Sequence, residues 1–267
     1  MRKTFGFHGG IHPPENKQQS LRTPIAAAGI PPELVIPLSQ HIGAPARPLV
    51  AVGDKVLKGQ MIAEPRGFVS VPIHAPTSGT IAAVEERVIA HPSGFTAPCI
   101  VITTDGRDEW VEHTGCSDYA SLDKGELIER IRNAGLAGMG GAGFPAAVKL
   151  SVKPETRITT LIINGTECEP YITADDVLMR ERAHQIVVGT RILQQLIEPA
   201  ETLIGVEDNK PQGLAALRKA AESTGIEVVE FPTKYPSGGE KQLIEILTGK
   251  QVPSGGLPSD VGVICQN

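Results

Sequence analysis

GLAGMGGAGFPAAVKL, residues 135–150, contains five glycines within its first nine residues. Glycine is required where the backbone takes a positive φ, or where a ligand lies directly on peptide N–H groups with no Cβ in between. This density predicts a cradle for a phosphate group or a cofactor. The alternative is a glycine-rich turn that only joins two helices.

The segment before the glycines decides between the known phosphate loops. Gly138, Gly140 and Gly143 satisfy G-x-G-x-x-G, but that fingerprint needs a strand directly before it. Residues 123–135 instead carry apolar side chains at helical spacing, with Asp123 as a plausible N-cap and Gly135 as the stop. A helix running into the loop disfavours the ordinary dinucleotide site, and Phe144 in place of a lysine excludes a Walker A loop.

Length and composition narrow the class of protein. With 267 residues, two domains are expected, each large enough to bury a core. The net charge of −5 gives no support to nucleic-acid binding. No secretory signal and no membrane-spanning run is present, which predicts a soluble cytosolic chain.

Four cysteines are widely separated and lack the C-x-x-C spacing of zinc or iron–sulfur sites: Cys99, Cys116, Cys168 and Cys265. We therefore expect reduced thiols, no metal site and no cluster in this chain. The apolar run VGVIC is followed only by Gln266 and Asn267, so we expect a fragment of a longer protein.

The N-terminal third predicts an arm followed by a small all-β domain. In the arm, residues 1–33, His8 and His12 have a metal-binding spacing, but neighbouring glycines and prolines disfavour the helix it would need. Residues 34–104 alternate short apolar runs with turns. Residues 105–122 are polar and irregular, which indicates a linker or wrapping segment between domains.

Residues 48–104 resemble the biotinyl/lipoyl, or barrel-sandwich hybrid, fold. Carrier domains of that fold modify a lysine at a hairpin tip, but here no lysine lies between Lys58 and Lys124. A structural or docking role is therefore expected, without biotin or lipoate. His74 and His91 lie beside proline-containing turns and are expected to be turn or surface histidines.

Residues 123–267 predict an α/β domain. Near-continuous β-branched runs alternate with amphipathic segments, which is typical of a mostly parallel, Rossmann-like sheet with helices on both faces. The expected strands are 158–164, 202–208 and 226–231, and the expected helices are 175–197, 210–223 and 238–249.

Ligands of such sheets bind beyond the carboxyl ends of the strands, where this chain has NGTECEP, EDNK and PTKYPSGGEK. Several acids there have an alternative role as helix caps: Asp175, Asp176 and Asp208, with Asn209. Glu167 and Glu169 are harder to explain in this way, because no helical face accommodates them. Cys168 between them is a weak candidate nucleophile, since no histidine lies nearby in the sequence.

GLAGMGGAGFPAAVK, NGTECEP and YPSGGEK, in this order and spacing, resemble the FMN- and NADH-binding subunit of respiratory complex I and its soluble hydrogenase relatives over residues 125–267. With the arm HGGIHPPENK and the lysine-free β domain, nearly the whole chain resembles the C subunits of the Rnf/Rsx ion-translocating electron-transport complexes. A flavin-bearing cobalamin reductase family shares the glycine loop but is expected to lack the arm and the β domain.

The resemblance implies roles for individual residues. Glu167 would approach the flavin, Glu169 would meet the nicotinamide, and Phe144 would stack on the dinucleotide. The remaining expected FMN and nucleotide contacts are Gly138, Gly140, Gly141, Gly143, Lys149, Asn164, Tyr235, Gly238, Gly239, Glu240, Gln266 and Asn267. Thr166 stands in place of the family's usual aspartate, and Gly239 in place of the first of two glutamates.

The resemblance also implies the setting. The chain would exchange electrons between NAD(H) and FMN, with the other Rnf/Rsx subunits and ferredoxin or a similar carrier as partners. Four-iron four-sulfur clusters are expected only in a part of the protein beyond this chain. The assembly would be peripheral, on the cytoplasmic side of the bacterial inner membrane. The alternative is a chain that has lost flavin and serves as a docking scaffold for the membrane subunits.

Overall fold

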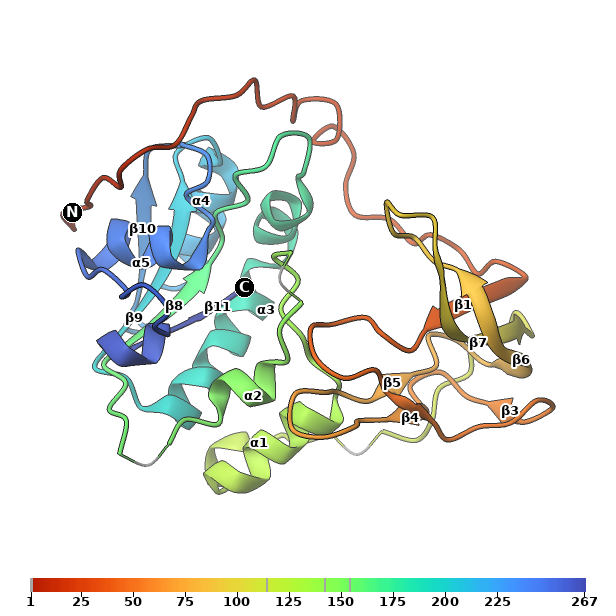
Figure 1. Ribbon diagram of the computed structural model, residues 1–267. Helices are drawn as coiled ribbons and strands as arrows, with labels where there is room; N and C mark the ends of the chain where they lie inside the picture. Colours follow the sequence, from red (N-terminus) through yellow and green to blue (C-terminus); the bar gives the residue numbers. More distant parts are fainter. Residues whose placement is uncertain (1, 114, 142, 154) are drawn as a thin grey trace. The chain divides into compact units, whose positions relative to one another are not determined.

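The computed structural model describes residues 2–113, 115–141, 143–153 and 155–267 (Figure 1). The chain packs into two compact units. The α/β unit comprises Met1–Ala26 and Val152–Asn267, and the barrel unit comprises Ala27–Ser151. This division differs from the expected boundaries at residues 33 and 123, because the arm packs with the sheet and the glycine loop packs with the β strands.

The α/β unit is built on a four-stranded parallel sheet of order β10-β9-β8-β11. Its strands are β8 (Thr160–Asn164), β9 (Glu201–Glu207), β10 (Ile226–Phe231) and β11 (Val263–Gln266). β9 is buried along nearly its whole length, which explains its near-continuous run of apolar residues. The prediction of a parallel sheet is confirmed, with β10 at the expected bounds.

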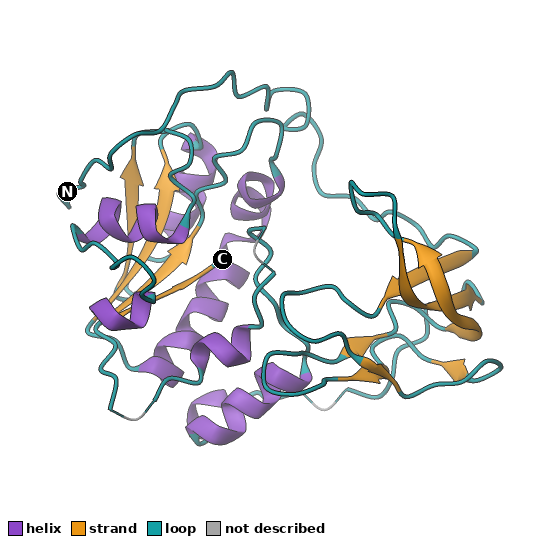
Figure 2. Ribbon diagram, viewed as in Figure 1, coloured by secondary structure: helices purple, strands orange, loops and turns teal. Residues whose placement is uncertain are grey.

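Helices cover both faces of this sheet, as Figure 2 shows. The helices α3 (Ala174–Ile197) and α4 (Pro211–Ala220) pack together over Ile204 and Val206. Helix α5 (Glu240–Thr248) packs over the opposite face, against Leu203 and Phe231. A 3₁₀ turn at Pro258–Val261 leads into β11. None of the helices in the described part of the chain has the length and apolar character needed to cross a membrane.

The helix ends agree with the sequence at some positions and differ at others. Helix α5 ends at Gly249, whose φ of 72° is the left-handed conformation expected of a glycine stop. Asp175 and Asp176 lie in the first turn of α3, as expected, but neither is its N-cap, and neither Asp208 nor Asn209 is the N-cap of α4. Helix α3 begins after Thr173 and α4 after Lys210, and neither side chain makes a capping bond.

The barrel unit contains two antiparallel sheets of order β1-β7-β6-β3 and β2-β4-β5. Their strands are β1 (Glu33–Pro37), β2 (Arg47–Pro48), β3 (Lys55–Val56), β4 (Met61–Glu64), β5 (Ile73–His74), β6 (Gly79–Val88) and β7 (Thr96–Thr104). Aliphatic side chains from both sheets, including Ile62, Ile81 and Ile100, form one core. The predicted small all-β domain is therefore present.

The expected linker, residues 105–122, lies within the barrel unit and packs against it. Lys58 N–H donates to the Glu109 carbonyl at 2.8 Å, and Val111 N–H donates to the Lys58 carbonyl at 3.0 Å. The Lys58 ammonium also lies 2.6 Å from an Asp108 carboxylate oxygen and 4.8 Å from the centroid of the Trp110 ring. A short 3₁₀ turn, Tyr119–Ser121, follows before the helix that leads to the glycine loop.

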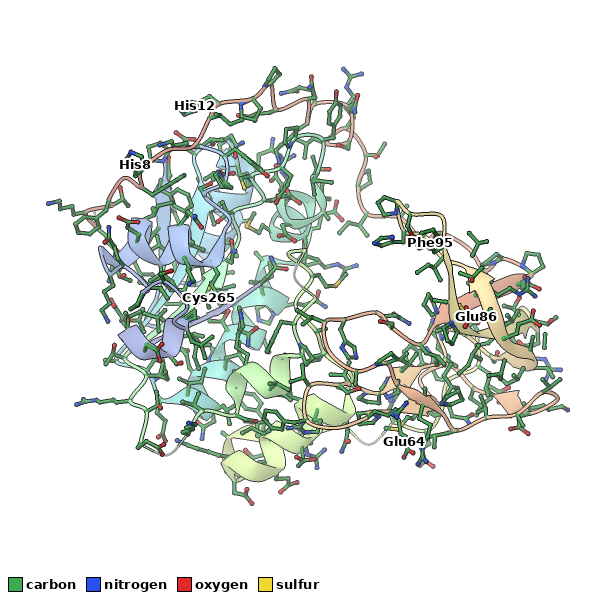
Figure 3. The ribbon with its side chains drawn as sticks, in the orientation of Figure 1. His8, His12, Glu64, Glu86, Phe95 and Cys265 are labelled. Carbon is green, nitrogen blue, oxygen red and sulfur yellow. The ribbon has the colours of Figure 1, made fainter. Side chains whose placement is uncertain are left out.

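Residues 2–32 of the arm follow an extended path without helix or strand elements, and His8 and His12 are both exposed on it (Figure 3). This agrees with the expectation that the two histidines do not share a helical face. The arm runs along the α/β unit, to which it is hydrogen-bonded at several points.

Candidate functional site

The glycine loop is held between two helices of the barrel unit, α1 (Lys124–Asn133) and α2 (Ala146–Leu150). Asp123 caps α1 by accepting a hydrogen bond from Glu126 N–H at 2.9 Å, and Gly135 has a φ of 70° directly after the helix. The expected helix running into the loop is confirmed. This arrangement differs from the strand–loop–helix order of an ordinary dinucleotide site.

The base of the loop closes like a small hairpin. Gly138 N–H donates to the Phe144 carbonyl at 2.9 Å, and Ala146 N–H donates to the Leu136 carbonyl at the same distance. Residues 139–141 and 143 therefore form the tip of this hairpin. Met139 on this tip is 91% exposed, so the tip is not filled by the chain's own packing.

Gly141 in the tip has a backbone conformation that favours glycine. Its φ of 97° strains any residue with a Cβ, yet an added Cβ would meet no atom within 4 Å. The glycine is thus required by backbone conformation, and the space above it is open. Gly143 has a φ of 55°, and a Cβ added to it would lie 3.4 Å from the His41 Cα.

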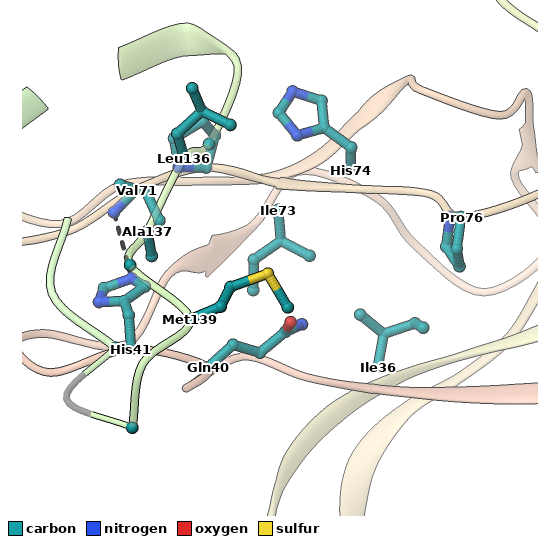
Figure 4. A pocket seen from close by; sticks show the side chains of 15 residues that line it. Ile36, Gln40, His41, Val71, Ile73, His74, Pro76, Leu136, Ala137 and Met139 are labelled. Atoms are coloured by element: carbon teal, nitrogen blue, oxygen red, sulfur yellow. Dashed lines mark hydrogen bonds between the residues drawn. The ribbon is translucent and has the colours of Figure 1, made fainter. Parts of the chain in front are cut away.

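A pocket of about 580 Å³ lies between the loop and the β strands of the same unit (Figure 4). His41 at its rim accepts from Val71 N–H at its Nε2, at 3.1 Å, so its Nδ1 carries the proton that bonds the Ile42 carbonyl at 2.9 Å. His74 also lines the pocket, and burial lowers the pKa of its imidazole. The expectation that His74 is a surface histidine was wrong, whereas His91 lies in an exposed turn bonded to Ser93.

Phe144 and Lys149 lie close together at the end of the loop. The Lys149 ammonium is 6.0 Å from the centroid of the Phe144 ring, and both side chains are half-buried. A cation beside the glycine tip suits an anionic ligand, and the partly exposed ring suits a stacking partner.

A second group of predicted residues meets at the carboxyl end of β8, in the α/β unit. The Asn164 side chain donates to the Gly238 carbonyl at 2.9 Å and accepts from Thr166 N–H at 3.1 Å. Asn267 donates to the Asn164 carbonyl at 3.1 Å and to an Asp175 carboxylate oxygen at 3.0 Å. The structure therefore brings the NGTECEP, YPSGGEK and C-terminal residues together at one edge.

Glu167 and Glu169 occupy different environments. Glu167 is buried, with a φ of 53°, and its two carboxylate oxygens accept from Asp175 N–H at 2.6 Å and Asp176 N–H at 3.1 Å. It thereby caps α3 from outside the helix, where the dipole favours a negative charge. Burial nevertheless raises the pKa of the Glu167 carboxyl, although these two hydrogen bonds lower it. Glu169 is exposed.

Cys168 is buried against the glycine motif. Gly238 N–H points at its Sγ at 3.3 Å, and a Cβ added to Gly238 would approach that sulfur to 3.1 Å. Burial raises the pKa of the Cys168 thiol, which disfavours the thiolate a nucleophile needs. Glycine at 238 is thus explained by close packing, and a catalytic cysteine is not supported.

Sequence reasoning missed a buried ion pair at the carboxyl end of β9. The Lys210 ammonium lies 2.8 Å from a Glu207 carboxylate oxygen, and both side chains are fully buried. Ser237 donates to the other Glu207 oxygen at 2.6 Å. The sequence places EDNK at the ligand-binding ends of the strands, with helix capping by Asp208 or Asn209 as the alternative, and nothing in its composition distinguishes a buried pair from a solvated one. The pair ties the YPSGGEK loop to β9.

The remaining predicted residues surround the same edge. Tyr235 is half-exposed beside the arm, Gly239 is the N-cap residue of α5, and Glu240 is its first helical residue. Gln266 ends β11, and its Nε2 is buried without a hydrogen-bond partner, as is the Thr166 Oγ1. Across the described residues these are the two buried side-chain atoms left unpaired, and both lie at this edge. A polar ligand there would satisfy them.

No group of three or more histidine, cysteine or acidic side chains in the described ranges is arranged to hold a metal ion.

Comparisons with known proteins agree with this layout. A family model described as the RnfC barrel sandwich hybrid domain matches residues 5–107, and one described as the Nuo51 FMN-binding domain matches residues 131–267. The C subunit of the ion-translocating oxidoreductase complex of Pseudomonas aeruginosa is 52% identical over all 267 residues, which make up 34% of its length. The corresponding protein of Vibrio cholerae serotype O1 is 54% identical over 265 residues, 99% of this chain and 34% of the relative.

A solved NAD⁺-reducing NiFe-hydrogenase in the H₂-reduced state aligns with a TM-score of 0.47 and 26% identity, over 56% of this chain and 29% of that one. The chain spans about a third of the length of the curated relatives it matches. The Nuo51 match alone covers about half of the chain, and the RnfC match precedes it in the same order as the two predicted domains. The chain therefore belongs to the Nuo51 FMN-binding domain family, in the branch formed by the C subunits of the ion-translocating oxidoreductase (Rnf) complexes.

Proposed function

We propose that this chain binds FMN and exchanges electrons with NAD(H) as part of an ion-translocating electron-transport complex. The observation that carries the proposal is the match of residues 131–267 to an FMN-binding domain, within which the strand-end residues form a polar edge with two unpaired buried atoms. We infer a Rossmann-like role for the sheet, in which the ligand meets the carboxyl ends of the strands.

The residues present suit a flavin mononucleotide. Open space above Gly141 and the exposed loop tip favour contact between peptide N–H groups and a phosphate. In the proposal, Gly138, Gly140 and Gly143 share this contact, Lys149 supplies positive charge, and Gln266 and Asn267 add amide donors. Bound FMN would supply the capacity to accept a hydride, and the protein would supply binding and orientation.

The acids receive distinct roles. Because the Glu167 carboxylate is engaged by two amides of α3, we propose that it acts through position, by fixing the backbone between Asn164 and Asp175, rather than by touching the flavin. In the proposal, the exposed Glu169 orients the nicotinamide, and Phe144 stacks on the dinucleotide. Nearby Tyr235, Gly238, Gly239 and Glu240 complete the nucleotide site in the proposal.

The setting follows from the relatives. We propose that the other subunits of an Rnf complex are the partners, that ferredoxin or a similar carrier exchanges electrons with the assembly, and that the assembly lies on the cytoplasmic face of a bacterial inner membrane. We further propose that four-iron four-sulfur clusters are held in a part of the protein beyond this chain.

Stopped-flow absorbance of the FMN-loaded chain mixed with NADH tests the proposal. Loss of a hydrogen bond to a charged group costs about 1.5–3 kcal/mol, so Glu169→Gln should slow flavin bleaching roughly ten- to a hundredfold if the contact is fully expressed in the transition state. Glu222→Gln is the matched control, because Glu222 is exposed and precedes β10 at the opposite edge of the sheet.

Bleaching of Glu169→Gln at the parental rate would remove Glu169 from the proposal. A parent chain that binds FMN but is not bleached by NADH would contradict the exchange with NAD(H). A parent that takes up no FMN would favour the docking scaffold instead.

A further inference from the structure

The N-terminal arm contacts all three loops that follow β8, β9 and β10. Figure 1 shows the arm, in red, crossing the edge toward which the arrowheads of β9 and β10 point. Its contacts come from residues far apart in sequence from the loops, so they are tertiary and not local. The arm therefore forms part of the same edge as the strand-end residues described above.

Lys17 makes the central contact. Its side chain is only 5% exposed, although lysine is almost never fully buried without partners. The ammonium donates to the Glu167 carbonyl at 2.7 Å and to the Ile172 carbonyl at 2.6 Å. These two carbonyls lie near the two ends of the loop between β8 and α3, so one side chain fixes the span of the loop that carries Glu169.

Backbone groups of the arm add to this contact. Tyr171 N–H, in the same loop, donates to the Glu15 carbonyl at 2.8 Å. With the bond of 3.4 Å from the Ser20 hydroxyl to the Tyr171 carbonyl, four backbone groups of the loop are hydrogen-bonded to the arm. Of the three residues, only Glu167 is buried, so the cost of about 1–3 kcal/mol for an unpaired buried group applies to its carbonyl, whereas Tyr171 and Ile172 are exposed. The loop conformation therefore depends on the arm chiefly through the Lys17 contact to Glu167.

The other two loops are held as well. Asn209, after β9, donates to a Glu15 carboxylate oxygen at 2.9 Å. Ile11 and Tyr235 exchange two backbone hydrogen bonds of 2.9 Å, and Gly10 passes so close that an added Cβ would lie 2.7 Å from the Tyr235 carbonyl oxygen. One segment thus connects the loops that carry Glu169, the buried ion pair and the YPSGGEK motif.

Lys17 offsets part of the negative charge at this edge. Its ammonium interacts with the carboxylates of Glu15, Glu167 and Glu207 and with the ammonium of Lys210. Removing the Lys17 ammonium would make the net charge around the buried Glu167 carboxylate more negative. A polyanionic phosphate ligand would then meet a less favourable field.

We propose that Lys17 is a positioning residue of the cofactor site and that the arm is a structural component of that site rather than a flexible leader to the barrel unit. The part of this inference that concerns FMN rests on the proposed function. The part that concerns the loop between β8 and α3 stands on the contacts alone.

Amide hydrogen exchange and FMN titration of Lys17→Met test both parts. Methionine keeps most of the aliphatic stem and removes the donor. We expect amides of residues 166–176 to exchange at least tenfold faster, amides of β10 to change less than twofold, and the FMN dissociation constant to rise at least tenfold. Lys17→Arg, which retains two parallel donors, should recover most of both losses. Lys3→Met is the control, because Lys3 is an exposed lysine of the same arm.

Exchange in residues 166–176 equal to that of Lys3→Met would overturn the inference, as would equal acceleration across the whole α/β unit, which indicates general destabilisation. Faster loop exchange with unchanged FMN affinity would overturn the positioning role. If the parent chain binds no FMN, the proposed function fails, and the exchange data alone decide whether Lys17 holds the loop.

Discussion

Removing the ammonium of Lys210 should be among the most damaging single changes in the α/β unit. Lys210→Met keeps the aliphatic stem but leaves the Glu207 carboxylate fully buried, with Ser237 as its remaining hydrogen-bond donor of those described above. Lys210 also donates to the Asn209 side chain at 2.7 Å, so the substitution loosens the loop after β9 at a second point.

The expected magnitude follows from the geometry. At 2.8 Å and an effective dielectric constant of about 20, the attraction is about 6 kcal/mol, which desolvation of the two ions largely offsets. The pair therefore adds little net stability. Removing one partner, however, leaves an uncompensated buried charge and typically costs about 3–5 kcal/mol.

Native-state hydrogen exchange of the β9 and α5 amides measures this cost in the α/β unit by itself. A loss of 3–5 kcal/mol corresponds to roughly two to nearly four orders of magnitude in protection. Adding Glu207→Gln to Lys210→Met should recover about 2 kcal/mol or more, because the double variant buries no net charge. A loss below about 1 kcal/mol for Lys210→Met, or no recovery in the double variant, would refute the account of this pair.

Three further outcomes follow from the strand-end geometry. Gly238→Ala should weaken FMN binding and destabilise the chain by about 1 kcal/mol, because the added Cβ would lie 3.1 Å from the Cys168 sulfur, its nearest neighbour. Adding Cys168→Ala should reverse both effects, which FMN titration and urea unfolding of the parent, the two single variants and the double variant would measure. Burial raises the pKa of the Glu167 carboxyl in the folded state, so the stability that its protonated form contributes is lost as pH rises from about 4.3 through the folded pKa. Glu167→Gln should therefore lower the free energy of unfolding by more at pH 4 than at pH 7, as measured by urea unfolding. An equal loss at both pH values would contradict the raised pKa. Iodoacetamide should modify the exposed Cys116 in the native protein well before the three buried thiols, Cys99, Cys168 and Cys265. Peptide mass spectrometry over the time course would measure the order of modification.

Local sequence signals predicted the elements that local physics determines. The run IEVVEF predicted β10 at its observed bounds because β-branched and aromatic residues favour a strand, although its burial alternates and Glu227 and Glu230 are exposed, as suits a strand at the edge of the sheet. Gly135 and Gly249 marked helix ends because each takes a positive φ that a side chain would strain. The order of sheet and helices followed from the same alternation.

Contacts between distant residues could not be predicted in this way. Glu167 caps α3 across seven intervening residues, which replaces the local caps expected at Asp175 and Asp176. Lys17 looks like a solvated charge in a polar arm, and its burial depends on two carbonyls about 150 residues away in the chain. The burial of the Lys210 ammonium could not be predicted for the same reason.

Titration of the purified chain with FMN, followed by quenching of flavin fluorescence, tests the central claim most directly. The account predicts saturation at one FMN per chain. It also predicts that Gly141→Val abolishes binding while the barrel unit stays folded, because a β-branched residue is strained at a φ of 97° and fills the open space above the loop. Flavin that stays fully fluorescent and elutes apart from the parent chain would contradict the claim, as would a Gly141→Val variant that binds FMN as tightly as the parent.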